Sequence, residues 1–242
     1  HRIADSQAQN ALGVVRHGCR QGNFAIGDKP LGAEEARIHH AIIRKFRASQ
    51  RDRNEDMVSL TTPLCDFGWS APDFTLPGID GKPHSLSSCR GPRGLLVMFI
   101  CNHCPYVKAV LPRILRDCRE LAGLGIGAVA IMSNDPTDYP EDSFDNMRRI
   151  ATEMDFPFPY LLDASQAVAK AYGAVCTPDF FGFDAGLGLQ YRGRLDASGK
   201  APAPADARRE LFEAMREVAA SGRGPAAQTA GIGCSIKWRE AP

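Results

Sequence analysis

The clearest pattern of apolar positions lies near the middle of the chain. Residues 95–100 form a continuous apolar run directly after Gly94, as expected for a strand that is buried on both faces of a sheet. Pro105 suits the first turn of a helix, where its missing N–H is not needed. Apolar residues then recur at helical spacing, at Val107, Val110, Leu111, Ile114, Cys118 and Leu121. We predict a buried strand that leads into an amphipathic helix.

The segments on either side of this unit predict an α/β protein with a central mixed β-sheet flanked by helices. Upstream, residues 71–76 and 84–86 alternate between apolar and polar positions around a glycine-containing turn, which predicts an N-terminal β-hairpin. Downstream, residues 128–132 form a second buried strand, and this order favours a right-handed parallel crossover. The remaining patterns predict helices at 140–154 and 206–220, a strand at 158–162 and a hairpin from 179–184 to 189–193.

The two ends of the chain have different patterns. Residues 1–58 contain four of the six histidines and little apolar periodicity, with helical spacing only at residues 33–47. We expect a poorly ordered extension and regard Met57 as a candidate start, so that the residues before it need not be native coding sequence. The domain then spans residues 59–242. Its tail, residues 231–238, is apolar enough to predict that it docks on the domain, beside the cysteine pair described below.

Composition and charge exclude several classes of function. A hydrophobic content of 44% supports a folded core, and a net charge of +1 gives no reason to expect nucleic acid or a membrane surface as a partner. The chain has no apolar run near the ~20 residues that span a bilayer, and its N-terminal residues lack the apolar core of a signal peptide. We therefore expect a cytoplasmic protein, whose eight cysteines are mostly free thiols.

The candidate chemistry lies where the buried strand gives way to the helix. Cys101 and Cys104 form a C-x-x-C pair at the helix N-terminus, where backbone N–H groups and the helix dipole favour a thiolate. His103 lies between them and can add positive charge or a hydrogen bond, which would make the disulfide more oxidising. A bare C-x-x-C is also compatible with half of a zinc site or with two core cysteines. The strand and helix around it favour redox chemistry.

Four separated motifs carry a resemblance to a known family. They are N-H-C-P-Y-V at 102–107, Y-P-E-D at 139–142, C-T-P-D-F-F at 176–181 and G-C-S-I-K-W at 233–238. With the hairpin A-P-D-F-T-L before them, they resemble thioredoxin-like proteins of the alkyl hydroperoxide reductase/thiol-specific antioxidant (redoxin) type, within an uncharacterised group. The resemblance covers about residues 60–238 and implies a thioredoxin-like fold.

The resemblance also implies roles for individual residues. Pro178 would be the cis-proline that faces the cysteine pair, and the backbone of Thr177 would pair with the extended chain of a substrate. Peroxiredoxins carry Thr or Ser in place of the first cysteine and Arg where Pro178 stands here. Because this chain has Cys101 and no matching Arg, the resemblance favours disulfide exchange, with peroxide reduction by Cys104 as the alternative.

The favoured function is that of a thiol-disulfide oxidoreductase without a cofactor. Cys101, expected to be the more exposed and more acidic thiol, attacks a protein or small-molecule disulfide, and Cys104 then resolves the mixed disulfide. An unidentified thiol reductant would complete the cycle.

Two further cysteines provide a rival hypothesis from another class. Cys176 adjoins Pro178 and Cys234 belongs to the docking tail, so both are possible accessory thiols. Together with Cys101 and Cys104 they could bind zinc or an iron–sulfur cluster through four thiolates. The alternative interpretation is that Cys176 and Cys234 are buried as small hydrophobic residues.

Overall fold

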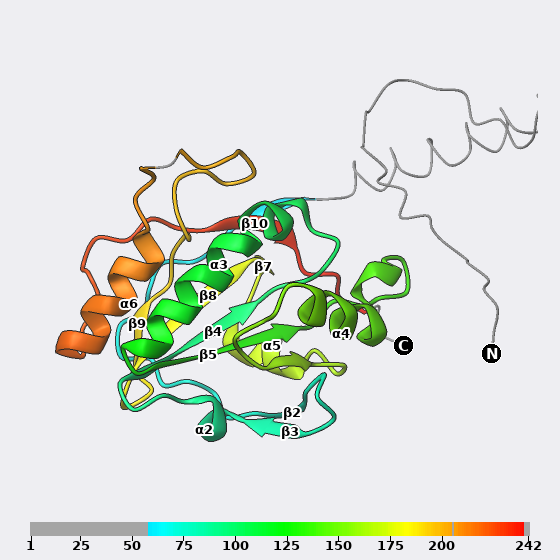
Figure 1. Ribbon diagram of the computed structural model, residues 1–242, viewed down its shortest axis with the longest axis horizontal. Helices are drawn as coiled ribbons and strands as arrows, with labels where there is room; N and C mark the ends of the chain where they lie inside the picture. Colours follow the sequence, from blue (N-terminus) through cyan, green and yellow to red (C-terminus); the bar gives the residue numbers. More distant parts are fainter. Residues whose placement is uncertain (1–57, 205, 240–242) are drawn as a thin grey trace, which may run out of the picture. The chain divides into compact units, whose positions relative to one another are not determined.

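The computed structural model describes residues 58–204 and 206–239, and its central sheet contains the predicted buried strand (Figure 1). That strand is β4 (Gly94–Phe99), and all of its residues are buried. On one side β4 pairs antiparallel with β8 (Asp179–Asp184), which pairs with β9 (Leu189–Tyr191). On the other side lies β5 (Ile126–Met132), which pairs parallel with β6 (Tyr160–Leu162). The sheet is therefore mixed, as predicted.

Alternation along β4 divides the core into two layers, because successive side chains of a strand point to opposite faces. Leu96 and Met98 belong to a cluster with apolar residues of α3 (Pro105–Gly123), α4 (Phe144–Glu153) and α6 (Glu210–Ser221). Leu95, Val97 and Phe99 belong to a second cluster with residues of α5 (Ala167–Tyr172) and of the short helix α2 (Leu86–Cys89). Helices thus cover both faces of the sheet, and the predicted α/β architecture is confirmed.

The N-terminal hairpin is also confirmed, whereas the helix predicted at 140–154 is interrupted. β2 (Thr75–Pro77) and β3 (Pro83–Ser85) pair antiparallel. At the interruption, a 3₁₀ turn, η1 (Pro140–Asp142), is followed by Ser143 in an extended conformation before α4 begins. The single continuous helix was therefore a wrong prediction. The break separates Asp142 from α4 and leaves its carboxylate free to bond the loop after β4.

The C-terminal tail forms a strand that the sequence patterns did not predict. β10 (Ile232–Ser235) lies between β1 (Ser59–Thr61) and β7 (Cys176–Thr177) and pairs antiparallel with both. Glycine has low strand propensity, and the segment contains one, which explains why the pattern was weak. Apart from Val58, the expected N-terminal extension and the candidate start lie outside the described residues.

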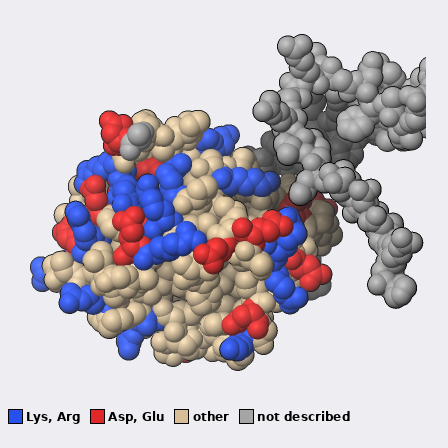
Figure 2. Space-filling model, in the orientation of Figure 1, with Lys and Arg blue, Asp and Glu red and all other residues tan. Residues whose placement is uncertain are grey.

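Charged side chains on the face formed by α3 and α6 form ion pairs and do not cluster into separate basic and acidic patches. Figure 2 shows basic and acidic residues intermixed there. Arg209 of the α6 N-cap binds Asp117 of α3 at 2.6 Å, and Arg194 binds Glu210 at 2.7 Å. This face therefore presents no extended surface of a single charge. Within the described ranges, none of the helices combines the length and apolarity that crossing a membrane requires.

Candidate active site

The C-x-x-C pair lies where the chain leaves β4 and enters α3. Cys104 is the N-cap of α3, with extended backbone angles, and Pro105 occupies the first helical position as predicted. The exposed fractions of Cys101 and Cys104 are 1% and 0%. The expectation that Cys101 is the more exposed thiol is therefore wrong: the loop after β4 folds beneath the tail and the turn at Asp142, so both sulfurs are buried.

Thr177 contacts both sulfurs of the pair. Its side-chain Oγ1 lies 3.2 Å from Cys101 Sγ, and its carbonyl oxygen lies 3.2 Å from Cys104 Sγ. The peptide bond between Thr177 and Pro178 is cis. The structure therefore brings together the cysteine pair and the Thr-Pro segment, although they are more than 70 residues apart in the sequence.

The two accessory cysteines have different positions relative to the pair. Cys234, on β10, places its sulfur 2.8 Å from Cys104 Sγ, closer than two sulfurs ordinarily approach without bonding. Cys176, on β7, instead directs its sulfur to the carbonyl oxygen of Pro178 at 3.6 Å, and burial raises the pKa of its thiol. None of the seven cysteines in the described part of the chain is joined to another by a disulfide.

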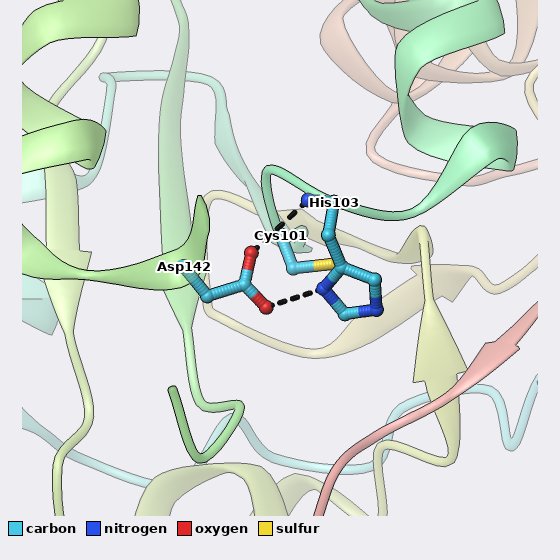
Figure 3. A group of neighbouring side chains, drawn as sticks. All are labelled: Cys101, His103 and Asp142. Carbon is cyan, nitrogen blue, oxygen red and sulfur yellow. Dashed lines mark hydrogen bonds and ion pairs between the residues drawn. The ribbon is translucent and has the colours of Figure 1, made fainter. Parts of the chain in front are cut away.

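A buried carboxylate, Asp142, organises the other side of the pair (Figure 3). Its Oδ1 accepts hydrogen bonds from the backbone N–H groups of Asn102, at 2.7 Å, and His103, at 3.1 Å. Its Oδ2 lies 2.6 Å from His103 Nδ1 and accepts from Asn134 Nδ2 at 2.9 Å. The ring of His103 also stacks on Tyr139 with 4.1 Å between centroids. His103 therefore bonds a carboxylate through Nδ1, which differs from the expected role of supporting a thiolate.

This arrangement separates the acidities of the two thiols. Burial, followed by the hydrogen bond with Cys104 and the charge of Asp142, holds the pKa of Cys101 well above its ordinary value. Hydrogen bonding with the thiol of Cys101, and next with that of Cys234, lowers the pKa of Cys104, and the backbone N–H of Val107 acts in the same direction. These shifts run opposite to the prediction that Cys101 is the acidic nucleophile, which rested on the order of the two cysteines at the helix start.

The thiols do not assemble into the four-thiolate metal site that was considered. Among the described residues, the only group of three or more potential ligand atoms lying within 4.8 Å of one another belongs to Cys101, His103 and Asp142. Cys104, Cys176 and Cys234 are outside it, so the four-thiolate hypothesis is wrong for this geometry. In the remaining group both carboxylate oxygens already accept two hydrogen bonds each, and the group is explained as a hydrogen-bond network.

Sequence reasoning missed the residues that surround the pair. Asp142 was assigned only to the predicted helix at 140–154 and to the Y-P-E-D motif, and Asn102 and Asn134 were given no role. Asn134 links the network to the tail, since its Oδ1 accepts from the backbone N–H of Lys237 at 3.0 Å. The Y-P-E-D motif was the available signal, because it contains an acid that no helix pattern required.

A sheet flanked by helices, with a cysteine pair at a helix start beside a cis-proline, defines a thioredoxin-like protein. Comparison with known families assigns it more narrowly: residues 67–194 match the AhpC/TSA family, and the chain belongs to that family. The predicted family and the thioredoxin-like fold are confirmed. The prediction of an oxidoreductase is confirmed at the level of the family.

Individual relatives extend the comparison. An uncharacterized conserved protein from Geobacillus kaustophilus is 40% identical, with a TM-score of 0.73 over 77% of this chain and 99% of its own. A hypothetical protein from Sinorhizobium meliloti 1021 is 35% identical, with a TM-score of 0.67 over 76% of this chain and 100% of its own. The thiol-disulfide oxidoreductase ResA of Geobacillus thermodenitrificans (strain NG80-2) is 26% identical over 124 residues, or 48% of this chain. The match spans 63% of that relative's length.

Proposed function

We propose that the protein is a thiol-disulfide oxidoreductase in which Cys101 and Cys104 alternate between dithiol and disulfide. The observation that carries this proposal is the contact of both buried sulfurs with one residue, Thr177. Two thiols held this close, one of them acidic, provide both a nucleophile and a resolving group. The similarity to a protein named as a thiol-disulfide oxidoreductase supports the same reaction.

The acidities assign the two roles in the reverse of the order expected from the sequence. The Cys104 thiolate attacks one sulfur of a substrate disulfide, forming a mixed disulfide and releasing the other sulfur as a thiolate. That leaving thiolate takes the proton of Cys101. Cys101 then attacks the sulfur of Cys104, the bond to the substrate breaks, and the second substrate sulfur leaves with its electron pair. The protein ends with a Cys101–Cys104 disulfide, which an external dithiol reduces.

The substrate that best fits this site is a small disulfide rather than an extended peptide. Thr177 is the register partner of Cys234 in the antiparallel pair of β7 and β10. Because Cys104 Sγ contacts both Thr177 and Cys234, the edge of β7 that faces Cys104 already holds a strand. The expected pairing of Thr177 with a substrate chain therefore conflicts with this structure, since β10 would have to leave first.

Peroxide reduction is the second candidate, and the acidity of Cys104 favours it. A thiolate at Cys104 would attack the peroxide O–O bond, yielding a sulfenic acid and an alcohol or water, and Cys101 would then displace water to form the disulfide. This route requires only a small substrate at the buried sulfur, which the occupied edge of β7 also favours.

Single-turnover assays of the reduced protein test and separate these functions. Oxidised glutathione, a disulfide-containing protein and hydrogen peroxide are supplied in turn, and formation of the Cys101–Cys104 disulfide is followed by peptide mapping. We expect oxidised glutathione to react faster than the protein substrate. Faster reaction with peroxide than with either disulfide would select the second candidate. Absence of a Cys101–Cys104 disulfide with all three would overturn the proposal.

A further inference from the structure

Among the described cysteines outside the C-x-x-C pair, Cys234 is the one whose sulfur lies against a member of the pair, 2.8 Å from Cys104 Sγ. We propose that Cys234 is a third redox thiol, which exchanges with Cys101 for disulfide bonding to Cys104 and thereby moves the oxidised bond from the C-x-x-C pair to the tail. This inference rests on the proposed dithiol function and extends it to a residue 130 positions away in the chain.

The tail is fixed in place from both sides of Cys234. Before it, Gly231 N–H donates to Thr62 Oγ1 at 2.9 Å, and β10 pairs with β1. After it, the backbone of Lys237 bonds Asn134 and Asp135 at 3.0 and 2.9 Å. The carbonyl of Lys237 also accepts from the side-chain amide of Gln166 at 2.8 Å. These bonds hold the chain on both sides of Cys234, so the contact of Cys234 with Cys104 is part of the fold.

A glycine allows β10 to come this close. A Cβ atom at position 233 would lie 2.3 Å from the carbonyl oxygen of Thr177, a distance that no larger residue accommodates without movement. Gly233 therefore permits β10 to approach β7 at the point where Thr177 meets the cysteine pair. Cys234 follows directly, and its position opposite Thr177 sets its sulfur beside Cys104.

Cys176 shows that burial in this sheet does not by itself bring a thiol to the pair. Like Cys234 it is almost fully buried, and it lies on the neighbouring strand opposite Ser235. Its sulfur nevertheless bonds the Pro178 carbonyl and lies outside the thiol contacts. If Cys234 served only as a small apolar residue, a buried position with its sulfur directed away from the pair, like that of Cys176, would fill the same space. The contact with Cys104 is specific to Cys234.

The exchange step conserves electrons and needs no added oxidant. In the oxidised protein, the Cys234 sulfur attacks the sulfur of Cys104, the Cys101–Cys104 bond breaks, and Cys101 leaves with the electron pair. The proton of Cys234 passes to Cys101. One disulfide replaces another, with Cys104 common to both, and Cys101 is left as a free thiol. Substrate supplies the initial oxidation, as in the proposed function.

The Cys101→Ser variant tests the proposal, because it leaves Cys234 as the partner available to Cys104. The folded, reduced variant is oxidised with diamide, its remaining thiols are alkylated, and its peptides are mapped by mass spectrometry. We expect a Cys104–Cys234 disulfide and the loss of two alkylatable thiols per molecule. Cys101→Ser/Cys234→Ser should lose this disulfide, and the matched control Cys101→Ser/Cys118→Ser, which removes a buried thiol of α3, should keep it.

The test of the Cys104–Cys234 bond can fail without contradicting the proposed reduction of disulfides. A Cys101→Ser variant with a native circular dichroism spectrum whose Cys104 and Cys234 remain alkylatable would overturn the inference, as would a Cys104–Cys176 bond. If Cys101→Ser does not fold, peptide mapping of the oxidised wild-type protein decides instead. A Cys104–Cys234 population beside the Cys101–Cys104 bond supports the exchange, and its absence contradicts it. Neither result changes whether wild-type protein reduces a disulfide, which the single-turnover assays measure.

Discussion

The two sides of the cysteine pair differ in the kind of polar group they present. On the side of Cys101 lies the carboxylate of Asp142, which is buried and accepts four hydrogen bonds. On the side of Cys104 the sulfur meets the thiol of Cys234, a backbone N–H at the start of α3 and the carbonyl oxygen of Thr177, none of which carries a charge. Two thiols three positions apart therefore have opposite shifts in acidity.

This difference shows that position in a motif does not assign the nucleophile. A negative charge in a low-dielectric environment opposes a second negative charge beside it, whereas neutral donors stabilise one. Burial, the hydrogen bond with Cys104 and the charge of Asp142 raise the pKa of Cys101, whereas hydrogen bonding with Cys101 and Cys234 lowers the pKa of Cys104. Each of the following substitutions alters the surroundings of one of the two thiols.

Removing the Cys104 sulfur should have the largest effect. With Cys104→Ser we expect turnover of disulfide and peroxide to fall by about 10³-fold or more, because the acidic nucleophile is lost and Cys101 remains a protonated thiol. Single-turnover rates measure the loss. Cys118→Ala, which removes a buried thiol on the same helix, is the matched control and should retain its activity. Comparable activity in Cys104→Ser would show that Cys101 reacts first.

Neutralising the carboxylate of Asp142 removes the negative charge on the Cys101 side of the pair. Asp142→Asn keeps the size of the side chain but replaces one acceptor oxygen by a donor group that faces His103 Nδ1 and Asn134 Nδ2. We expect the free energy of unfolding to fall by about 2–4 kcal/mol, measured by urea denaturation. The pKa of Cys101 should also fall, although burial and the hydrogen bond with Cys104 still raise it, because the charge of Asp142 is gone.

Asp145→Asn provides the control for this variant. Asp145 is exposed on α4, three residues from Asp142, so its replacement should change neither stability nor the pKa of Cys101. An Asp142→Asn protein as stable as the wild type would mean that the carboxylate does not hold the loop after β4.

A larger residue at position 233 should displace β10 and so weaken the contact of Cys234 with Cys104. In Gly233→Ala the added methyl group meets the Thr177 carbonyl, and we expect a cost of about 1–3 kcal/mol together with faster amide exchange in β10. Gly231→Ala is the matched control, because its added Cβ would lie no closer than 3.4 Å to any neighbour. Equal effects of the two substitutions would indicate general sensitivity of the tail and not a specific approach to Thr177.

The acidity of Cys104 also predicts how the stability of the reduced protein depends on pH. Its pKa is lowered in the folded state, so below the ~8.5 of a free cysteine the unfolded chain binds a proton at this thiol that the folded protein does not. The contribution of Cys104 is therefore fully present above that value and is lost as the pH falls towards the folded pKa.

This contribution appears as a difference between the reduced wild type and Cys104→Ser. Across the mildly acidic to neutral range, we expect the difference in free energy of unfolding to increase with pH, by at most ~1.4 kcal/mol per pH unit. Denaturation at several pH values gives the slope. A difference that is constant over this range would contradict a lowered pKa at Cys104.

The sequence predicted those parts of the fold that have strong local patterns, and it failed where long-range contacts decide. The apolar run of β4, the helical spacing of α3 and the hairpin at β2 and β3 are local properties, and each was found. The strand β10 is stabilised by pairing with β1 and β7, which lie far away in sequence, so its own pattern was weak.

The same distinction applies to the site. The motif located Cys101 and Cys104, and the resemblance located Thr177 and Pro178. The acidities could not be read from the motif, because Asp142 bonds His103, between the two cysteines, from 39 positions away, and Cys234 reaches Cys104 from 130. The assignment of the nucleophile therefore depended on residues whose proximity only the fold creates.

The most direct test of the account is the ionisation of the two thiols in the reduced wild-type protein. NMR of isotopically labelled cysteine Cβ atoms follows each thiol as a function of pH without requiring a reagent to reach the buried sulfurs. We predict that Cys104 is a thiolate at neutral pH, well below the ~8.5 of a free cysteine, while Cys101 remains protonated above that value. A spectrum in which Cys101 ionises first would contradict the central claim.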